Sequence, residues 1–378
     1  MCFLIISSYP QSLLNFRRSL IEALMHSGCD VHVAAPFIGG ECPFRAELER
    51  LGVVVHRIPM RRVGINPLFD IMTVASLWWL MLRVRPNSVL AYTVKPVIYG
   101  LLAARFAGVQ KRFALITGLG YVFGEEASIS VDRKRAIIKW IVLRLYVRAL
   151  TNIGRVFFQN PDDQALFEKL GIVTDTNLST VVNGSGVDLM EFAVAPLPAE
   201  INFLLIARLM GDKGVREYVY AARLVKKQYP DICFSLVGWI DDNPDAILQM
   251  ELDEWIAEGV IDYQGKLDDV RPAIAGCSVY VLPSYREGTP RTVLEAMSMQ
   301  RPIITTDAPG CRETVIDGEN GYLVEVRSVN SLVNAMMKFV NDPSLILRMA
   351  KKSREIAEQK YDVNKVNREM LRAMEVDS

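Results

Sequence analysis

Short apolar runs alternate with longer amphipathic segments along the first half of the chain. The apolar runs predict strands at 3–7, 31–35, 53–58, 88–92, 112–116, 155–159 and 180–183. The segments between them predict helices at 13–27, 43–51, 67–84, 96–107, 133–150 and 162–170. Repeated strand–helix units with short apolar strands are typical of a parallel sheet with helices on both faces. The pattern therefore predicts one doubly wound α/β domain.

The same alternation restarts after a Pro- and Ala-containing stretch at 193–200, which is the predicted linker. The second half predicts strands at 201–207, 232–238, 260–264, 278–282, 302–305 and 321–324. We therefore predict two Rossmann-like domains, residues 1–192 and 200–360, followed by a helix at about 362–378. Two such domains in tandem are expected to face each other across a cleft, with ligands beyond the carboxyl ends of the strands.

Two carboxylates stand out in the second half, because they flank a predicted helix start. Glu287 lies in the loop after an apolar strand, and Glu295 lies eight positions later, which predicts a place about two turns into the helix. Between them, Gly288 precedes Thr289, the predicted N-cap, and Pro290, which suits the first helical position. The positive end of this helix would open at the loop, where it could hold a phosphate.

Two cations form the second candidate group. Arg208 follows the strand 201–207, and Lys213 comes five residues later, directly before a glycine and a helix. This order is suited to cradling a diphosphate, with Arg as a fork and Lys as a point charge. Carboxylates accept hydrogen bonds from paired hydroxyls, so Glu287 and Glu295 could hold sugar and ribose groups. The alternative is that all four are solvated surface charges.

Composition narrows the class of protein. The chain has 378 residues, of which 51% are hydrophobic and 23% charged, so a full core is available. Its six cysteines are scattered without a CxxC pair, which favours a reduced cytosolic chain. The three histidines, at positions 26, 32 and 56, show no ligand spacing. The sequence therefore predicts neither a zinc site nor a histidine-based triad.

Charge is unevenly distributed along the neutral chain. Residues 1–190 hold 21 Lys and Arg against 14 Asp and Glu, a net charge of +7, so the remainder carries −7. A basic first half is expected to face an anionic partner, although ordinary surface variation gives the same imbalance. Nothing in the pattern indicates a nucleic-acid partner.

The predicted helix 133–150 is basic and amphipathic. It carries no acidic residue, and apolar side chains such as Trp140 lie between its cations. This pattern suits an anionic membrane surface, and Trp78 and Trp79 beside Arg83 could assist. The alternative is an ordinary domain helix with solvated cations. The longest apolar run, 71–82, is shorter than the roughly 20 residues that cross a bilayer, so we expect no membrane-spanning segment.

These motifs together resemble the family-4 retaining glycosyltransferases, which have the GT-B fold. Glu287 and Glu295, inside PSYREGTPRTVLEA, match the paired-glutamate motif of that family, and Arg208 and Lys213 match its diphosphate-binding cations. NGSGVD at 183–188 and PGCRETVIDGENGYLV at 309–324 are also similar. The resemblance covers essentially the whole chain. It implies a nucleotide-diphosphate sugar donor, no metal, and retention of anomeric configuration.

The resemblance also implies roles for the second-domain residues. Glu287 would contact the transferred sugar and Glu295 the ribose, while Arg208 and Lys213 would stabilise the departing diphosphate. The donor site would further include Gly288, Thr289 and Pro290, and the backbone at Leu267 for the base. The last helix would return to pack on the first, acceptor-side domain.

The first domain departs from the commonest family pattern. Ser7 to Pro10, with Ser8 and Tyr9, stand where many relatives have a glycine pair, and Lys95 lies where many have a histidine. The segment TGLGY, which starts with Thr117 and Gly118, resembles a loop in the subgroup of enzymes that extend polyprenyl-diphosphate-linked oligosaccharides. The segment VGWIDDNP at 237–244 points to the same subgroup. These five residues are the candidates for the acceptor or sugar side, although Lys95 could also be only a helix-start cation.

We therefore predict a metal-independent, retaining hexosyltransferase without a cofactor. Its donor would be a UDP-sugar, and its acceptor a lipid-diphosphate-linked saccharide of bacterial O-antigen, capsule or other glycan synthesis. The enzyme would lie in the cytoplasm, peripheral on the inner face of the membrane through the helix 133–150. One alternative is a nucleotide-sugar epimerase on the same fold, against which the scarcity of histidine argues. Another is a non-catalytic subunit that binds a nucleotide-sugar.

Overall fold

The computed structural model describes residues 1–39, 42–61, 64, 66–118, 133–241 and 243–376, with only the backbone of 133–137 and 139. The described chain divides into two compact units. Unit 1 comprises Met1–Ser185 and Val366–Ser378, and unit 2 comprises Gly186–Lys365. Residues 186–200, which include the predicted linker, therefore belong to unit 2, where Val187 and Phe192 are buried in its core.

Unit 1 is built on a seven-stranded sheet in the order β3-β2-β1-β4-β5-β6-β7, and all its strand pairs are parallel. Its strands are β1 (Cys2–Ile6), β2 (Asp30–Ala35), β3 (Val54–Arg57), β4 (Ser88–Tyr92), β5 (Lys111–Ile116), β6 (Arg155–Phe158) and β7 (Ser179–Val181). The doubly wound parallel sheet predicted for the first half is confirmed.

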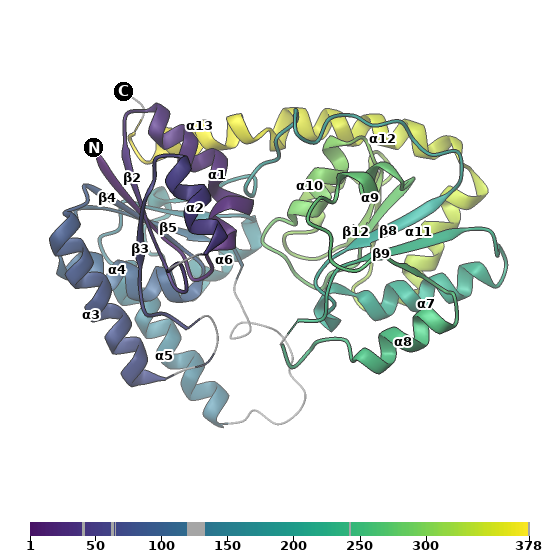
Figure 1. The fold of residues 1–378 in the computed structure, drawn as a ribbon. Coiled ribbons are helices and arrows are strands. Elements are labelled where there is room, and N and C mark those ends of the chain that lie inside the picture. Colours follow the sequence, from purple (N-terminus) through teal and green to yellow (C-terminus); the bar gives the residue numbers. More distant parts are fainter. Residues whose placement is uncertain (40–41, 62–63, 65, 119–132, 242, 377–378) are drawn as a thin grey trace. The chain divides into compact units, whose positions relative to one another are not determined.

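Helices cover both faces of this sheet because alternate strand residues point to opposite sides (Figure 1). One face packs against α3 (Pro67–Val84), the π-helical segment η1 (Pro96–Gly100), α4 (Leu101–Phe106), α5 (Arg133–Ala149) and α6 (Pro161–Lys169). The other face packs against α1 (Gln11–His26), α2 (Pro43–Arg50) and the C-terminal helix α13 (Val363–Ala373). Met370 and Leu371 of α13, and Met374 directly after it, are buried in the core of unit 1.

Unit 2 contains a six-stranded parallel sheet in the order β10-β9-β8-β11-β12-β13. Its strands are β8 (Asn202–Ile206), β9 (Cys233–Val237), β10 (Asp262–Tyr263), β11 (Val279–Leu282), β12 (Ile303–Thr306) and β13 (Gly321–Val324). The second parallel-sheet domain predicted from the sequence is therefore confirmed as well.

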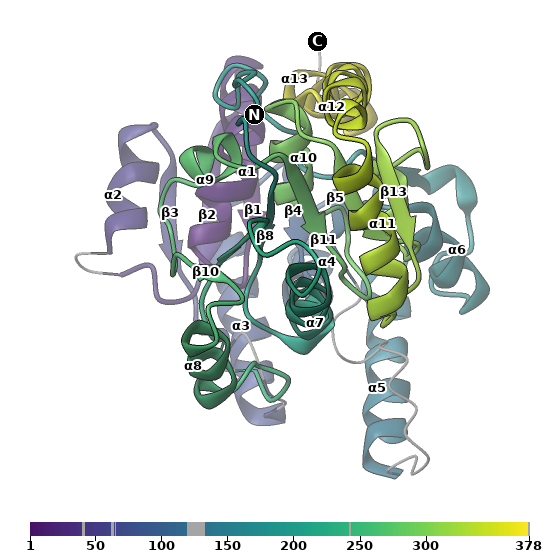
Figure 2. The ribbon, with the colours of Figure 1, turned by 90° about the vertical axis from the view of Figure 1, so that its right-hand side faces the viewer.

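Two helical layers also enclose the sheet of unit 2 (Figures 1 and 2). One core includes side chains of α7 (Val215–Lys226), α8 (Gln249–Ala257), α11 (Val329–Asn341) and α12 (Ser344–Ile356). The opposite core includes α9 (Arg271–Ala275), α10 (Arg291–Ser298) and the π-helical segment η6 (Ala357–Tyr361). Short 3-10 segments occur at Thr176–Leu178, Gly211–Lys213 and Arg312–Thr314.

Helix α3 has two apolar faces. By length and composition alone it could cross a membrane, with 18 residues and a mean hydropathy of 1.3. Its inner face is nevertheless part of the domain core, since Leu77 and Met81 are buried there. An outer stripe of exposed apolar side chains runs along the same helix, at Leu68, Ile71, Met72, Trp78, Trp79 and Leu82. We therefore interpret α3 as a domain helix that presents an apolar surface to its surroundings.

Candidate active site

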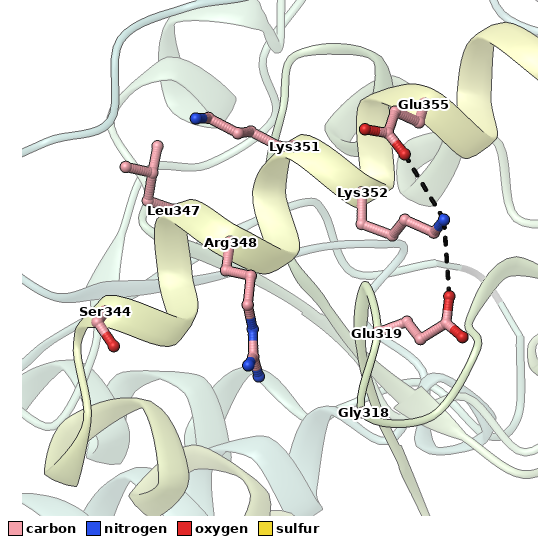
Figure 3. Close-up of a pocket in the computed structure, with 8 residues that line it drawn as sticks. All are labelled: Gly318, Glu319, Ser344, Leu347, Arg348, Lys351, Lys352 and Glu355. Carbon is pink, nitrogen blue, oxygen red and sulfur yellow. Dashed lines mark ion pairs between the residues drawn. The ribbon is translucent and has the colours of Figure 1, made fainter.

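One pocket in unit 2 lies along α12, and eight residues line it (Figure 3). Lys352 lies between Glu319 and Glu355, at 3.7 and 3.6 Å from their carboxylate oxygens. Among the eight lining residues there is no residue predicted for the donor site. The chemistry predicted from the sequence is instead found at the carboxyl ends of the strands.

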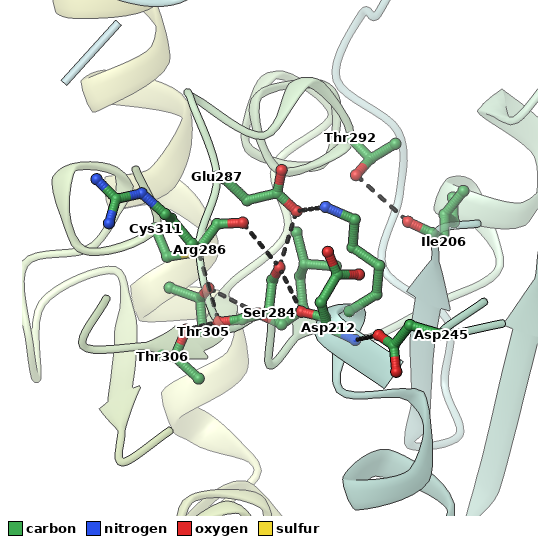
Figure 4. A network of polar contacts seen from close by, with 12 residues as sticks. Ile206, Asp212, Asp245, Ser284, Arg286, Glu287, Thr292, Thr305, Thr306 and Cys311 are labelled. Atoms are coloured by element: carbon green, nitrogen blue, oxygen red, sulfur yellow. Dashed lines mark hydrogen bonds and ion pairs between the residues drawn. The ribbon is translucent and has the colours of Figure 1, made fainter. Parts of the chain in front are cut away.

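Lys213 and Glu287 meet in unit 2, on the loops that follow the neighbouring strands β8 and β11 (Figure 4). The Nζ atom of Lys213 donates to Oε1 of Glu287 at 2.6 Å, and Ser284 Oγ donates to the same oxygen at 2.9 Å. Only 13% of the lysine side chain and 18% of the glutamate side chain are exposed. The structure thus brings together two residues that lie 74 positions apart.

The backbone fixes this pair. Gly214, at the start of α7, has φ of +70°, and a Cβ there would lie 2.2 Å from the carbonyl oxygen of Pro283. The amide of Tyr285 donates to the carbonyl of Asp212 at 2.8 Å, and Ser284 Oγ lies 3.1 Å from the same carbonyl oxygen. The two loops are therefore bonded to each other directly, and glycine is required where they approach most closely.

Asp212 adds a second carboxylate near Lys213. Its amide donates to Oδ2 of Asp245 at 2.8 Å, and burial raises the pKa of its carboxyl group. Its Oδ1 atom is buried without a hydrogen-bond partner in the described part of the chain. Burial disfavours the charge on Lys213, but Glu287 and Asp212 outweigh it and raise the pKa of the lysine. Lys213 is therefore a buried, charged ammonium group.

Arg208, the other predicted cation, also has an acidic partner. Its Nη1 atom donates to Oδ2 of Asp241 at 2.8 Å, and a third of its side chain is exposed. Asp241 follows β9, the strand next to β8. Arg208 lowers the pKa of both Lys213 and Asp212, so it lies within electrostatic reach of them.

Glu295 lies on α10, but two details of the prediction were wrong. The helix begins at Arg291 with Pro290 as its N-cap, one residue later than predicted, because Pro290 is extended with ψ of 111°. Glu295 is thus the fifth helical residue, about one turn from the start rather than two. Oε1 of Glu295 accepts from Nε of Arg291 at 2.9 Å. Burial raises the pKa of Glu295 to about 7, although Arg291 opposes this.

Leu267, the residue predicted to contact the base, follows β10, an edge strand of the sheet in unit 2. Leu267 is half-buried and packs against the core that contains α9 and α10. The preceding residue, Lys266, places its Nζ 5.1 Å from the centre of the Trp239 ring, and 42% of Trp239 is exposed. An exposed aromatic ring beside this loop is a natural surface for a nucleotide base.

In unit 1, Ser8 and Tyr9 follow β1. The hydroxyl oxygens of Ser8 and Thr93 lie 2.9 Å apart, which joins the loops after β1 and β4. Tyr9 is 40% exposed, and its hydroxyl donates to Gln11 at 2.6 Å. Thr93 has a positive φ of 69°, an uncommon conformation for a β-branched residue that is often found at functional sites.

Lys95 is paired within unit 1. Its Nζ lies 3.2 Å from Oδ1 of Asp70, a buried residue in the first turn of α3, and Asp70 also bonds the hydroxyl of Tyr99. Thr117 and Gly118 follow β5 and are half-buried. The remaining residues of the TGLGY segment, and residue 242 of VGWIDDNP, lie outside the described residues.

Two of the three histidines, which show no ligand spacing in the sequence, meet in the structure. Nδ1 of His32 and Nε2 of His56 lie 2.8 Å apart, and the two rings are stacked. His32 is on β2 and His56 on β3, which are adjacent in the sheet. The sequence spacing does not reveal this pair, because the two histidines are 24 positions apart and meet only through the pairing of their strands.

Sequence reasoning missed three further residues of the cluster, Asp212, Asp241 and Ser284. Asp212 is directly next to Lys213, and Asp241 lies in the VGWIDDNP segment, so both could have been found by asking which acids neutralise the predicted cations. Ser284 carried no signal, because a serine after a strand is common.

Comparisons with known proteins agree with the fold. A family model described as "Glycosyl transferase 4-like domain" matches residues 15–184, and one described as "Glycosyl transferases group 1" matches residues 200–342. Together the two models match most of the chain, and the boundary between them lies near the change of unit.

Curated relatives include two transferases that act on lipid-linked sugars. The first is the N,N'-diacetylbacillosaminyl-diphospho-undecaprenol alpha-1,3-N-acetylgalactosaminyltransferase of Campylobacter jejuni, which is 26% identical over 96% of this chain and 95% of that protein. The second is the UDP-Gal:alpha-D-GlcNAc-diphosphoundecaprenol alpha-1,3-galactosyltransferase of Escherichia coli, which is 24% identical over 76% of this chain and 75% of that protein.

A similar solved structure is that of Anabaena HepE in complex with UDP and glucose. It has a TM-score of 0.78 and 18% identity, and it covers 99% of each chain. This likeness shows the GT-B architecture of two parallel-sheet domains. From the family models, the relatives and the fold, the chain belongs to the family-4 glycosyltransferases and is a glycosyltransferase with the GT-B fold.

Proposed function

We propose that the chain is a retaining glycosyltransferase that moves a hexose or an N-acetylhexosamine from a UDP-sugar to a polyprenyl-diphosphate-linked saccharide. Neither a catalytic metal nor another cofactor is part of the proposal. The observation that carries it is the buried pair of Lys213 and Glu287, which joins a cation and a carboxylate at the carboxyl ends of β8 and β11. Ligands of doubly wound sheets bind at such ends.

Lys213 and Arg208 would bind the donor diphosphate. Each is already held by a carboxylate, Lys213 by Glu287 and Arg208 by Asp241, so each is positioned before the donor arrives. When the bond between the sugar and the diphosphate breaks, negative charge develops on the leaving oxygen. Two cations that are held in place would stabilise that charge without reorganisation. They supply the positive charge that a divalent metal provides in other transferases.

Glu287 would hold the transferred sugar. One of its oxygens accepts from Lys213 and Ser284, which fixes the orientation of the carboxylate. Its amide donates to the carbonyl of Pro309 at 2.9 Å, which also fixes the backbone. A carboxylate held in this way accepts hydrogen bonds from sugar hydroxyls and thereby places the anomeric carbon beside the diphosphate. Gly288, Thr289 and Pro290 connect this carboxylate to α10 and complete the loop at the donor.

Glu295 would hold the ribose. It is buried on α10 beside Arg291, and burial outweighs this cation and raises the pKa of its carboxyl group. Two ribose hydroxyls that donate to the carboxylate would stabilise the charged form. The base would then lie near Leu267, where the exposed ring of Trp239 offers a stacking surface. UDP as the nucleotide is supported by HepE, whose structure contains UDP.

The proposed class of acceptor is based on the names of the two curated relatives. The names of the Campylobacter jejuni and Escherichia coli enzymes specify sugars linked to undecaprenol through a diphosphate. We propose an acceptor of that class, with Ser8, Tyr9, Lys95, Thr117 and Gly118 on the acceptor side. These residues follow β1, β4 and β5, three adjacent strands of unit 1.

A lipid-linked acceptor requires that the enzyme reach a membrane surface. The apolar stripe on α3 repeats at three- and four-residue intervals, and 60% of Trp79 is exposed. Arg83 lies over the Trp79 ring, which is an arrangement suited to the boundary between lipid tails and headgroups. On α5, Trp140 is also 60% exposed and has Arg144 over its ring. We propose that α3 and α5 dock unit 1 on the inner face of the cytoplasmic membrane.

Product analysis tests the reaction. The purified chain is incubated with UDP-sugars and a short-chain polyprenyl-diphosphate-linked saccharide in the presence of EDTA, and UDP release and the anomeric proton of the product are measured. The proposal predicts acceptor-dependent UDP release and an α-linked product from an α-linked donor. An epimerised UDP-sugar formed without acceptor would instead identify an epimerase. UDP binding without turnover of any acceptor would indicate a non-catalytic subunit.

A further inference from the structure

The first three strands of unit 1 bring four side chains with metal-binding atoms to one face of the sheet. Cys2 on β1 pairs with Asp30 on β2, so the two point to the same side. His32 lies two residues after Asp30 and therefore shares that side. His56 on β3 pairs with Ala34, two residues beyond His32, and shares it as well.

The distances within this group are short. One ligand atom from each of Cys2, Asp30 and His32 lies within 4.8 Å of the others. Nε2 of His32 is 3.2 Å from Oδ2 of Asp30, while its Nδ1 is 2.8 Å from Nε2 of His56. The side chain of Asp30 is 65% exposed and that of His32 is 13% exposed, so an ion could enter from solvent and be held against the sheet.

A thiolate, a carboxylate and an imidazole are the ligand types that zinc prefers. Bonds of about 2.0–2.3 Å in a tetrahedral site place ligand atoms roughly 3.3–3.7 Å apart. Asp30 and His32 are already at about that spacing. Rotation of the Cys2 side chain, which is half-exposed, would bring the third ligand in and leave the fourth position for water.

His56 would act on His32 rather than on the ion. A histidine that binds a metal through one ring nitrogen commonly donates the other N–H to a neighbouring acceptor, which fixes its tautomer. Nδ1 of His32 has such an acceptor in Nε2 of His56.

We propose that Cys2, Asp30 and His32 form a binding site for a divalent metal ion of the zinc class, with His56 orienting His32. The site lies at the first residues of β1 and β2, whereas the loops considered for the acceptor follow the opposite, carboxyl ends of the strands. A metal there would therefore tie β1 to β2 and take no part in the catalytic reaction. Such a site replaces the expectation that the chain has no zinc site.

Cobalt substitution is the direct test. The full chain without an affinity tag is freed of metal under reducing conditions and titrated with Co²⁺. The proposal predicts saturation at one equivalent, with visible bands of a tetrahedral ion and a near-ultraviolet band from sulfur to cobalt. Zn²⁺ should displace the cobalt and raise the melting temperature of the wild-type chain, since an ion that binds only the folded state stabilises it.

Variants separate the roles. Cys2→Ser should lose the sulfur-to-cobalt band, and Asp30→Asn should weaken Zn²⁺ binding at least tenfold. His56→Gln should keep the band but weaken binding by about 10- to 100-fold, as expected for an orienting residue. The matched controls are Cys42→Ser and His26→Gln, which remove a thiol and an imidazole elsewhere in unit 1 and should bind metal like the wild type. Turnover with EDTA-treated enzyme should be unchanged in Cys2→Ser.

Two results would overturn the proposal. The first is a wild-type chain without tetrahedral cobalt bands at one equivalent. The second is Zn²⁺ affinity in Cys2→Ser and Asp30→Asn equal to that of the wild type. Both positions are at least partly exposed, and melting curves of the metal-free variants confirm that each is folded before the titration.

Discussion

Lys213 and Glu287 form a buried ion pair in which Nζ and Oε1 are 2.6 Å apart, and Glu287 is the main neutralising partner of Lys213. Removal of one partner of a buried ion pair takes away much of the compensation for the other charge, which commonly lowers stability by about 3–5 kcal/mol. Lys213→Met and Glu287→Gln should therefore each be destabilised, while the double variant should recover much of the loss. Urea unfolding of the four proteins measures this coupling.

A second, more exposed ion pair serves as the control for the coupling between Lys213 and Glu287. Arg223 and Glu258 form a more exposed pair within unit 2, and the same cycle there should give a coupling of no more than about 1 kcal/mol. Additive effects of the Lys213 and Glu287 substitutions would show that the pair is not the buried, mutually dependent unit described above.

The contact between Arg208 and Asp241 predicts a competition with the donor. The carboxylate of Asp241, which lies 2.8 Å from Arg208, repels a diphosphate that binds the same guanidinium group. Asp241→Asn should therefore tighten UDP binding by roughly fivefold, equivalent to about 1 kcal/mol, with the largest effect at low salt. Calorimetric titration with UDP is the measurement. Asp253→Asn, an exposed acid on α8, is the control, and weaker binding in Asp241→Asn would contradict the competition.

Glu295 predicts a pH dependence of stability. Its pKa of about 7 in the folded chain lies above the ordinary value of 4.5, so the folded state holds a proton that the unfolded state releases between these values. The stability that this proton contributes to the folded state is fully present below about pH 4.5 and is lost as the pH rises through 7. At pH 8, Glu295→Gln should be more stable than the wild type by up to about 3 kcal/mol, and at pH 5 the difference should be small.

The same variant should bind UDP less tightly, because a neutral amide is a poorer acceptor for the ribose hydroxyls. Thermal melts at pH 5, 6, 7 and 8, with and without UDP, show both effects. Glu355→Gln, an exposed acid on α12, serves as the control. A wild-type chain whose stability relative to Glu295→Gln does not change with pH would contradict a raised pKa.

The apolar stripe on α3 predicts membrane binding. Trp79→Glu and Ile71→Glu place charges on side chains that are 60% and 66% exposed, so the fold should tolerate them. Flotation with anionic liposomes should show at least a tenfold loss of binding, because a charge replaces apolar surface at the lipid boundary. Leu248→Glu, a similarly exposed position in unit 2, should bind like the wild type. Equal flotation of all four proteins would exclude this face as the membrane contact.

The sequence predicted the fold well, for identifiable reasons. Buried parallel strands are short apolar runs, so their places follow from hydrophobicity alone, as for β4, all of whose residues are buried. Glu287, Glu295, Arg208 and Lys213 could be selected because they directly follow such strands or the helix start. Their mutual contacts could not, since the ion pair depends on loops that β11 and β8 bring together.

Other features depend on strand pairing or on packing, and the sequence could not show them. His32 and His56 meet only because β2 and β3 pair in one particular register. The start of α10 differs from the prediction by one residue because Pro290 takes an extended conformation. The outer face of α3 was also underestimated. The sequence singled out Trp78 and Trp79 for the membrane, and only the packed helix reveals that Leu68, Ile71, Met72 and Leu82 are exposed with them.

The most direct test of the donor site is the turnover of Lys213→Met and Glu287→Gln with the UDP-sugar and acceptor that the wild type uses. If these side chains stabilise the leaving diphosphate and hold the sugar, kcat should fall by about 10²-fold or more in each, with each variant folded at the assay temperature. Wild-type turnover in both variants would contradict the assignment of this pair to the catalytic centre.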